Sequence, residues 1–356
     1  MKPYIPRIGI TALLTTAALA MSACSTAYNG PVSSHFDGKH FFNPDHTKES
    51  SVAGYLWLRL TSSQATWPTV VPLSSHPAPP ASVNDGSARV TLVGHATLLI
   101  QVAGLNILTD PVWSERASPI SFAGPKRITP PGVAWDALPR IDLVLISHDH
   151  FDHLDLPTLS RLDARDRPRV LAPLGHRSIL VETMPASRVS EHDWGEVVTL
   201  PTAGAASAPV KVHLEPMLHG SGRSPFDQQQ RLWAAFVIEA AGLKLLHIGD
   251  SGYGDGRVFR EIGNKHGGFD LAIIPIGAYE PASFMKDSHM SPAEAVKLLA
   301  DVRARQGMAH HFEAFQLGFE AHDAPRSALK LALEAAGLTA GTFLAPVAGQ
   351  GFTFKP

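Results

Sequence analysis

The run IDLVLISHDHFDHLD, residues 141–155, decides how this sequence is interpreted. Its opening part, 141–147, is almost continuously apolar, which is typical of a strand that is buried on both faces. From Ser147 onward, nine residues contain three histidines and three aspartates. Folds that contain parallel strands bind their ligands beyond the carboxyl ends of those strands. The run therefore predicts a buried strand that ends in a ligand-binding loop.

The composition indicates which classes of function this protein can have. The chain has 356 residues, of which 44% are hydrophobic and 17% charged, and this balance is typical of a globular protein with a sizeable core. With a formal net charge of −2, the chain lacks the excess of positive charge that is typical of nucleic-acid-binding proteins, so no nucleic-acid partner is expected. Eighteen histidines are an unusual number. Because histidine is largely neutral at physiological pH, it is a good metal ligand.

The N-terminus has the pattern of a secretory signal. Lys2 and Arg7 form a basic region, and an apolar stretch of about a dozen residues follows over 8–20. Such a stretch is too short to span a bilayer as a helix. We therefore expect residues 1–23 to be a signal peptide.

Cys24, the only cysteine of the chain, follows this signal directly and has no partner for a disulfide. The segment resembles a bacterial lipobox in which Met21 replaces the usual leucine. That resemblance implies cleavage before Cys24, lipidation of its thiol and anchoring at a membrane surface. Ser25 does not match the inner-membrane retention signal, which favours the periplasmic side of the outer membrane. The alternative is an ordinary signal peptide with a chance cysteine at its end.

The mature chain divides into an extension and one large domain. Residues 24–87 are rich in small and polar residues, and we expect a tether with a short helix around 52–60 and a proline-rich linker over 76–87. The large domain is expected over 88–356.

Within this domain, apolar and alternating runs predict strands in both halves of the chain. They cover 89–94, 97–102, 105–110, 141–147, 210–216, 232–240, 243–250 and 269–277. Helical patterns cover 291–305 and 324–337, and Ser291 with Glu294 forms a capping box at the start of the first. Strands in both halves with interspersed helices indicate two packed sheets with helices outside.

The histidine run has the pattern H-x-H-x-D-H, formed by His148, His150, Asp152 and His153. In an extended or turning segment the first two can converge on one ion, and the last two are directed at a second site beside it. This signal is strong, because such spacing seldom arises by chance. The alternative is a solvated polar loop.

Further ligands stand at the ends of later apolar runs. His219 follows 210–216, Asp250 ends 243–250, and His311 follows a helix near another expected strand end. Each residue alone is weak evidence for a metal site, since a single histidine is more often structural or solvent-exposed. Together they complete one site of three histidines and one of two histidines and an aspartate, with Asp250 able to bridge the two.

The order of these motifs resembles the metallo-β-lactamase superfamily, and within it the family of phospholipases D that hydrolyse N-acylphosphatidylethanolamine. The resemblance covers roughly 40–354 and implies an α+β fold, the four-layer αβ/βα sandwich. The motifs that carry it are GHATLLI (94–100), LTDPVWSERASPISFAGPKR (108–127), IDLVLISHDHFDHLD (141–155), GDSGY (249–253), FDLAIIPIGAYEP (269–281) and DSHMSPAEAV (287–296).

By matching positions, the resemblance implies two Zn²⁺ ions, and the nitrogen and oxygen donors leave iron and manganese open. The implied ligands are His148, His150 and His219 for the first ion, Asp152, His153 and His311 for the second, and Asp250 as the bridge. His289, in DSHMSP, matches a histidine that contacts the substrate phosphate. Asp152, Asp250 and His289 are thus the expected catalytic residues.

Four neighbouring residues are expected to have other roles. His95 is interpreted as structural or as a contact of a ligand, and His310 as directed away from the metals. Asp149 and Asp155 are expected to orient ligands or to accept hydrogen bonds from the backbone.

The sequence departs from the family pattern at two positions near the expected substrate cleft. Glu313 stands where a small residue is usual, and Gly220 where an aromatic neighbour of His219 is usual. Both departures put the identity of the substrate in doubt.

The resemblance implies a zinc-dependent hydrolase of phospholipase D type that cleaves a phospholipid to phosphatidic acid and an N-acylethanolamine. An alternative with the same site is a metal-dependent lactonase or another hydrolase of the cell envelope. A third alternative, from a different class, is a non-catalytic envelope lipoprotein that keeps the fold for binding.

Overall fold

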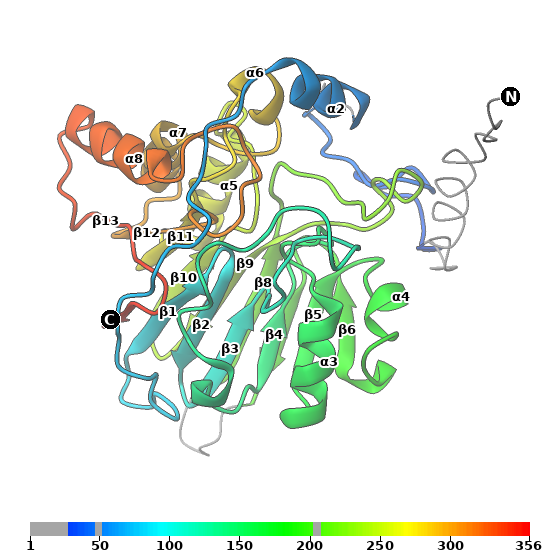
Figure 1. Ribbon diagram of the computed structural model, residues 1–356. Coiled ribbons are helices and arrows are strands. Elements are labelled where there is room, and N and C mark those ends of the chain that lie inside the picture. Colours follow the sequence, from blue (N-terminus) through cyan, green and yellow to red (C-terminus); the bar gives the residue numbers. More distant parts are fainter. Residues whose placement is uncertain (1–27, 47–51, 202–207) are drawn as a thin grey trace, which may run out of the picture.

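The structure is a computed structural model, which describes residues 28–46, 52–201 and 208–356 (Figure 1). The expected signal peptide and Cys24 lie outside the described residues. Two seven-stranded sheets pack against each other, and helices cover the outer faces. The predicted four-layer sandwich is therefore confirmed.

The first sheet has the strand order β14-β1-β2-β3-β4-β5-β6. Its strands are β1 Ala88–Gly94, β2 Thr97–Val102, β3 Leu105–Thr109, β4 Leu143–Leu145, β5 Arg169–Pro173, β6 Val189–His192 and β14 Gly351–Phe354. Pairing is antiparallel from β14 to β3 and parallel from β3 to β6. The carboxyl ends of β3, β4 and β5 consequently meet at one edge.

The second sheet has the order β13-β12-β11-β10-β9-β8-β7. Its strands are β7 Val197–Leu200, β8 Val210–Glu215, β9 Ala235–Ala240, β10 Leu243–His247, β11 Leu271–Pro275, β12 Gly307–His310 and β13 Phe343–Leu344. Strands β10 to β13 are parallel. Their carboxyl ends also lie at one edge, so each sheet offers a row of strand ends.

The helices are α2 Val52–Thr61, α3 Leu156–Arg165, α4 Arg177–Leu180, α5 Arg257–His266, α6 Ala282–Met285, α7 Pro292–Asp301 and α8 Ala324–Ala335, with short 3₁₀ turns at Trp135–Ala137 and Ala186–Arg188. Helix α7 begins with the predicted capping box, in which Ser291 N donates to Glu294 Oε2 at 2.8 Å and Glu294 N to Ser291 Oγ at 3.3 Å.

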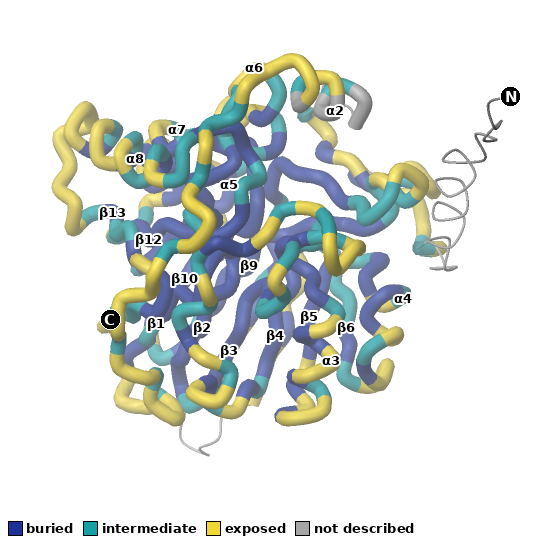
Figure 2. The backbone as a smooth tube through the Cα atoms, viewed as in Figure 1, coloured by how far each residue is buried: buried dark blue, intermediate teal, exposed yellow. Residues whose placement is uncertain are grey.

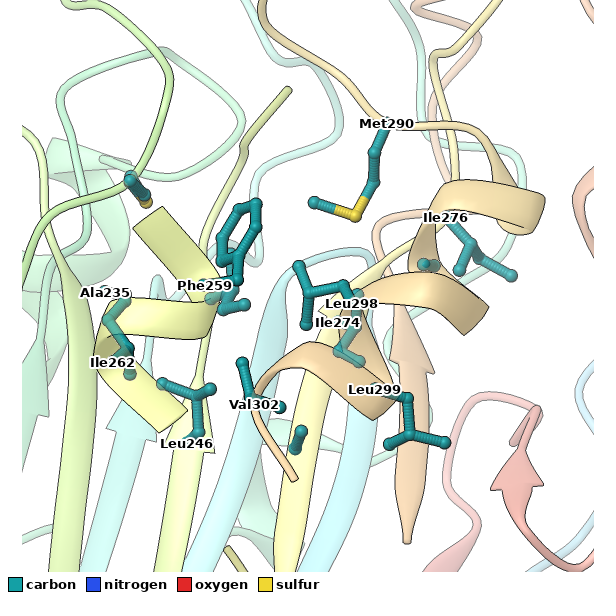
Figure 3. Close-up of a cluster of buried hydrophobic side chains, with 14 of the residues drawn as sticks. Ala235, Leu246, Phe259, Ile262, Ile274, Ile276, Met290, Leu298, Leu299 and Val302 are labelled. Atoms are coloured by element: carbon teal, nitrogen blue, oxygen red, sulfur yellow. The ribbon is translucent and has the colours of Figure 1, made fainter. Parts of the chain in front are cut away.

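Three hydrophobic clusters hold the layers together. The inner cluster lies between the sheets and includes Ile100 and Ile238. A second cluster packs α3 and α4 on the first sheet. The third packs α5, α7 and α8 on the second sheet, as Phe259 and Leu298 show in Figure 3. Strand β2 is buried along its whole length, because both of its faces are covered (Figure 2).

The extension differs from the expected tether where it is described. Phe36 and Phe41 are each 1% exposed and belong to the cluster on the second sheet. Phe41 N donates to Gln229 O at 2.7 Å, and the proline-rich segment is tied to the first sheet by a bond from Gly104 N to Val83 O at 2.8 Å. Residues 28–46 therefore pack on the domain through Phe36 and Phe41. Residues 76–87 are tied to it by a backbone hydrogen bond instead of leading freely away from it.

The short helix expected around 52–60 is present as α2, and it exposes Trp57 and Leu60. Among the helices of the described chain, none combines the length and the apolar character that crossing a bilayer requires.

Candidate metal centre

All seven predicted ligands lie beyond the carboxyl ends of strands. The loop 148–153 follows β4, and His219 follows β8. Asp250 and His311 come after β10 and β12. The two rows of strand ends bring these segments together, and their side chains form overlapping groups of closely spaced donor atoms.

The first group contains His148, His150 and His219. His150 Nδ1 lies 3.0 Å from His148 Nε2 and 3.2 Å from His219 Nε2. His219 donates from Nδ1 to the carbonyl of Ser288 at 2.9 Å, so its Nε2 keeps a lone pair. His148 Nδ1 lies 3.0 Å from Ser147 Oγ, which leaves Nε2 of this ring as the inward donor as well.

The second group contains Asp152, His153 and His311, whose donor atoms also lie close to His95. Asp250 joins this group through His153 and His311. His311 Nε2 lies 3.2 Å from Asp152 Oδ2 and 3.0 Å from Asp250 Oδ2. His153 Nε2 lies 3.4 Å and 3.1 Å from the same two oxygens. Each of the four expected ligands in this group exposes less than a tenth of its surface, so these donors are held away from bulk solvent.

These spacings fit metal coordination. Four ligands around a tetrahedral zinc ion with bonds of about 2.0–2.1 Å stand about 3.3 Å from one another. The donor separations in both groups, 3.0–3.4 Å, lie close to that value. Asp250 Oδ1 is buried and has no hydrogen-bond partner among the described residues, while Oδ2 faces the second group. The same carboxylate lies within reach of His148 and His219, so it stands between the two groups.

The electrostatics of the second group favour a cation. Burial raises the pKa of the Asp152 and Asp250 carboxyls, but His153 and His311 outweigh it and hold both pKa values well below their usual range. Burial lowers the pKa of His311, yet Asp250 and Asp152 raise it to about 9. Two buried carboxylates thus retain their charge and attract positive charge between them.

Asp110 is a residue of this site to which the sequence analysis assigned no role. His153 donates from Nδ1 to Asp110 Oδ2 at 2.8 Å, and both side chains are fully buried. Asp110 also accepts from Ser147 N at 2.7 Å and Ser147 Oγ at 2.6 Å. A carboxylate in this position orients a metal-binding imidazole and sets its tautomer. The signal for it was the Thr-Asp-Pro sequence at the end of β3.

Asp110→Asn is expected to weaken metal affinity by roughly 10–100-fold, because the amide holds His153 less firmly in the required tautomer. Titration with a competing chelator measures the change. Asp142→Asn is the matched control, since Asp142 accepts a backbone hydrogen bond from Asn106 at 3.0 Å at the other end of the sheet. Equal affinities of the two variants would contradict the role given to Asp110.

The flanking aspartates accept hydrogen bonds from elsewhere, as predicted. Asp149 Oδ1 accepts from Gly222 N at 2.7 Å, and Oδ2 pairs with Arg231 Nη1 at 2.8 Å. Asp155 accepts from Ser114 N at 3.0 Å. Both therefore support the loop instead of facing the donor groups.

Three further histidines named in the sequence analysis occupy distinct places. His95 Nε2 lies 2.8 Å from Asp152 Oδ2 and so contacts an expected ligand. His310 is directed away and donates from Nε2 to Ile248 O at 2.7 Å. His289 is at the rim, with 14% of its side chain exposed and Nδ1 3.8 Å from Asp250 Oδ2.

The two departures from the family pattern have local explanations. Arg326 pairs with both oxygens of Glu313, at 3.0 and 2.9 Å, so this charge is compensated. A Cβ at Gly220 would stand 2.9 Å from Gln229 Oε1, the atom that accepts from Ser221 N. Glycine there allows the loop after β8 to close on itself. The predicted influence of both positions on the substrate stays a prediction.

With this geometry established, comparison with known proteins identifies the family. A model of the β-lactamase superfamily domain matches residues 105–312, more than half of the chain. The chain belongs to this superfamily. A *Caenorhabditis elegans* protein named N-acyl-phosphatidylethanolamine-hydrolyzing phospholipase D 1 is 37% identical over 258 residues, which are 71% of each chain. The chain therefore also belongs to the family of phospholipases D that hydrolyse N-acyl-phosphatidylethanolamine.

One further relative and one solved structure have names that refer to metal-dependent chemistry. An *Opitutus terrae* protein named as a metal-dependent hydrolase is 28% identical over 230 residues, which are 64% of this chain and 85% of that one. The metallo hydrolase Igni18 of *Ignicoccus hospitalis* shares the fold, with a TM-score of 0.56 and 20% identity over 76% of this chain and 99% of that one. This member of the superfamily is a metallohydrolase.

Proposed function

We propose that the protein is a two-zinc phosphodiesterase of phospholipase D type, which hydrolyses N-acylphosphatidylethanolamine to phosphatidic acid and an N-acylethanolamine. The observation that carries the proposal is the pair of donor groups that share Asp250, in a chain of this family. The substrate is inferred from the name of the *C. elegans* relative.

The proposed ligands divide between the two donor groups. They are His148, His150 and His219 for one zinc, Asp152, His153 and His311 for the other, and Asp250 between them. Nitrogen and oxygen donors without a thiolate suit zinc, with iron and manganese as the alternatives. Two divalent cations in such a site supply a nucleophilic water at neutral pH and positive charge for the phosphoryl oxygens.

The protein's own part is to position the phosphate. His289 stands at the rim of the donor groups, where a ring nitrogen can donate a hydrogen bond to a phosphate oxygen or to the leaving group. Its loop is held from two sides, because His289 N donates to Met285 O at 2.8 Å and His46 Nε2 donates to Asp287 O at 2.9 Å. The extension therefore helps to fix the loop that carries His289.

The surface around the site also suits a lipid substrate. Phe122 and Phe226 are 82% and 80% exposed, on the loops that contact Asp155 and Asp149 respectively. Trp57 and Leu60 are exposed on α2. Both α2 and α6 lie near the top of Figure 1, and α6 is the helix that comes just before His289 in the chain. Exposed aromatic side chains bind the interfacial region of membranes, where their apolar rings are buried.

We also propose that Cys24 is lipidated and holds the protein at the periplasmic side of the outer membrane. The sequence pattern 1–24 supports this location, and a tether would hold the enzyme in the plane of its phospholipid substrate.

Cys24→Ser is expected to move the protein from the membrane fraction to the soluble fraction and to abolish incorporation of labelled fatty acid. Ser25→Ala is the control and is expected to remain in the membrane fraction. Retention of the Cys24→Ser protein in washed membranes, with label still incorporated, would refute the anchor.

The function is tested with fully metallated protein and N-acylphosphatidylethanolamine in mixed micelles. Both products are expected in equal amounts. Absence of both products would refute the proposed substrate. Turnover of lactones by the same preparation would then support the alternative hydrolase, whereas no turnover of either class would support a binding role.

A further inference from the structure

A second cluster of possible metal ligands lies on the outer face of the second sheet, away from the donor groups described above. His213 is on β8, Glu239 is on β9, and His266 is the last residue of α5. One ligand atom of each lies within 4.8 Å of the others. We propose that His213, Glu239 and His266 bind a separate Zn²⁺ ion, which joins the end of α5 to the sheet.

The donor atoms converge on one point. Glu239 Oε1 lies 3.6 Å from His213 Nε2 and 4.0 Å from His266 Nδ1. The two rings stand almost perpendicular, at 88°, with their centroids 5.0 Å apart. Donor atoms around a zinc ion stand about 3.3 Å apart, so the first separation exceeds that value by about 0.3 Å and the second by about 0.7 Å. Glu239 is 28% exposed, so its side chain has room to close that gap.

The tautomer of His266 suits this role. Its Nε2 lies 2.8 Å from Oε1 of Glu215, a carboxylate that is only 3% exposed. Because a carboxylate accepts, Nε2 is the nitrogen that donates to Glu215, and Nδ1, directed toward Glu239, is the nitrogen left to bind an ion. A buried carboxylate behind an imidazole is the arrangement that orients metal-binding histidines. Lys265 Nζ, 2.7 Å from the same oxygen, compensates the charge of Glu215.

His213 offers the second donor. Its Nε2 is buried and has no hydrogen-bond partner in the described part of the chain. Burial lowers the pKa of His213, which favours the neutral ring that metal binding requires. Leaving a buried polar nitrogen unpaired costs free energy, which a bound cation would offset.

The cluster is separate from the proposed active site. In the β8–β9 ladder, Glu239 pairs with Lys211 near the amino end of β8, whereas His219 follows the carboxyl end of that strand. Three protein ligands with one partly exposed carboxylate leave a coordination position for water. The alternative is that Glu239 only balances its cross-strand neighbours Lys211 and Lys244.

The experiment compares zinc content among full-length variants after loading with Zn²⁺ and gel filtration. Wild-type protein is expected to hold one zinc ion more per chain than His213→Gln or Glu239→Gln. Glu196→Gln is the matched control, because Glu196 pairs with His192 at 2.9 Å but belongs to no group of three donors found among the described residues. This control is expected to keep the wild-type content.

Glu239→His separates ligation from charge balance, because it retains a donor and removes the negative charge. It is expected to keep the zinc ion that Glu239→Gln loses, and this pair decides the question if His213→Gln fails to fold. The proposal would be overturned if Glu239→Gln held as much zinc as the wild-type protein. It would also be overturned if Glu196→Gln or Glu239→His lost as much zinc as Glu239→Gln. Hydrolysis is not measured, so the result is independent of the proposed function.

Discussion

Asp250→Asn is expected to lower kcat/KM for the phosphodiester by about 10³-fold, the effect of losing several kcal/mol of charge stabilisation in the transition state. The substitution keeps the shape of the side chain but removes the charge that lies 3.0 Å from His311 Nε2 and 3.1 Å from His153 Nε2. It also removes an anionic donor from between the two groups, so the metal content per chain should fall. Steady-state kinetics and elemental analysis of the same preparation test both effects.

Asp255→Asn is the control for this variant. Asp255 is an exposed carboxylate in the same loop, which accepts from Arg257 N at 2.9 Å, and its replacement should leave activity and metal content unchanged. An Asp250→Asn protein with wild-type metal content and activity would show that Asp250 does not bridge two ions.

Arg231→Met is expected to have the largest effect on stability, a loss of about 3–5 kcal/mol, the usual cost of removing one partner from a buried ion pair. Arg231 is 3% exposed, and its Nη1 lies 2.8 Å from both Asp149 Oδ2 and Asp227 Oδ2. Methionine fills the space but leaves two carboxylates without their cation. Urea unfolding should show a lower midpoint with an unchanged m value.

Arg305→Met is the matched control for an exposed ion pair. Arg305 Nη1 lies 2.9 Å from Asp270 Oδ1, but the arginine is 68% exposed, so solvent screens the interaction. Its replacement is expected to cost at most about 1 kcal/mol. If both variants unfold at the same midpoint, the buried triad contributes no more than a surface pair.

The strands that carry the site could be predicted because their signal is local. The run 141–147 is buried on both faces as expected, although the regular strand is shorter, at Leu143–Leu145. The flanking backbone still bonds to neighbours, since Ile141 N donates to Asp166 Oδ2 and Ile146 N to Leu171 O. The apolar pattern therefore located the strand, and pairing with neighbours set its ends.

Other elements could not be predicted, because their signal is not local. Strand β6 is mostly polar, and its parallel pairing with β5 makes it a strand. Residues 28–46 read as a polar tether, yet Phe36 and Phe41 fill a gap in the core that residues distant in sequence create. The expected strand 232–240 begins only at Ala235, because Ala234 N donates to Ser147 O in the loop after β4.

By itself, the sequence determined that this chain forms strands ending in histidines and aspartates, because apolar periodicity and the H-x-H-x-D-H spacing are properties of contiguous residues. Only the tertiary structure decided which side chains support them: Asp110 behind His153, Arg231 behind Asp149, and Glu215 behind His266. These partners are 43, 82 and 51 residues apart in the chain. Such pairs are selected by the packing of the two sheets and their loops, and no local pattern encodes a contact over that distance.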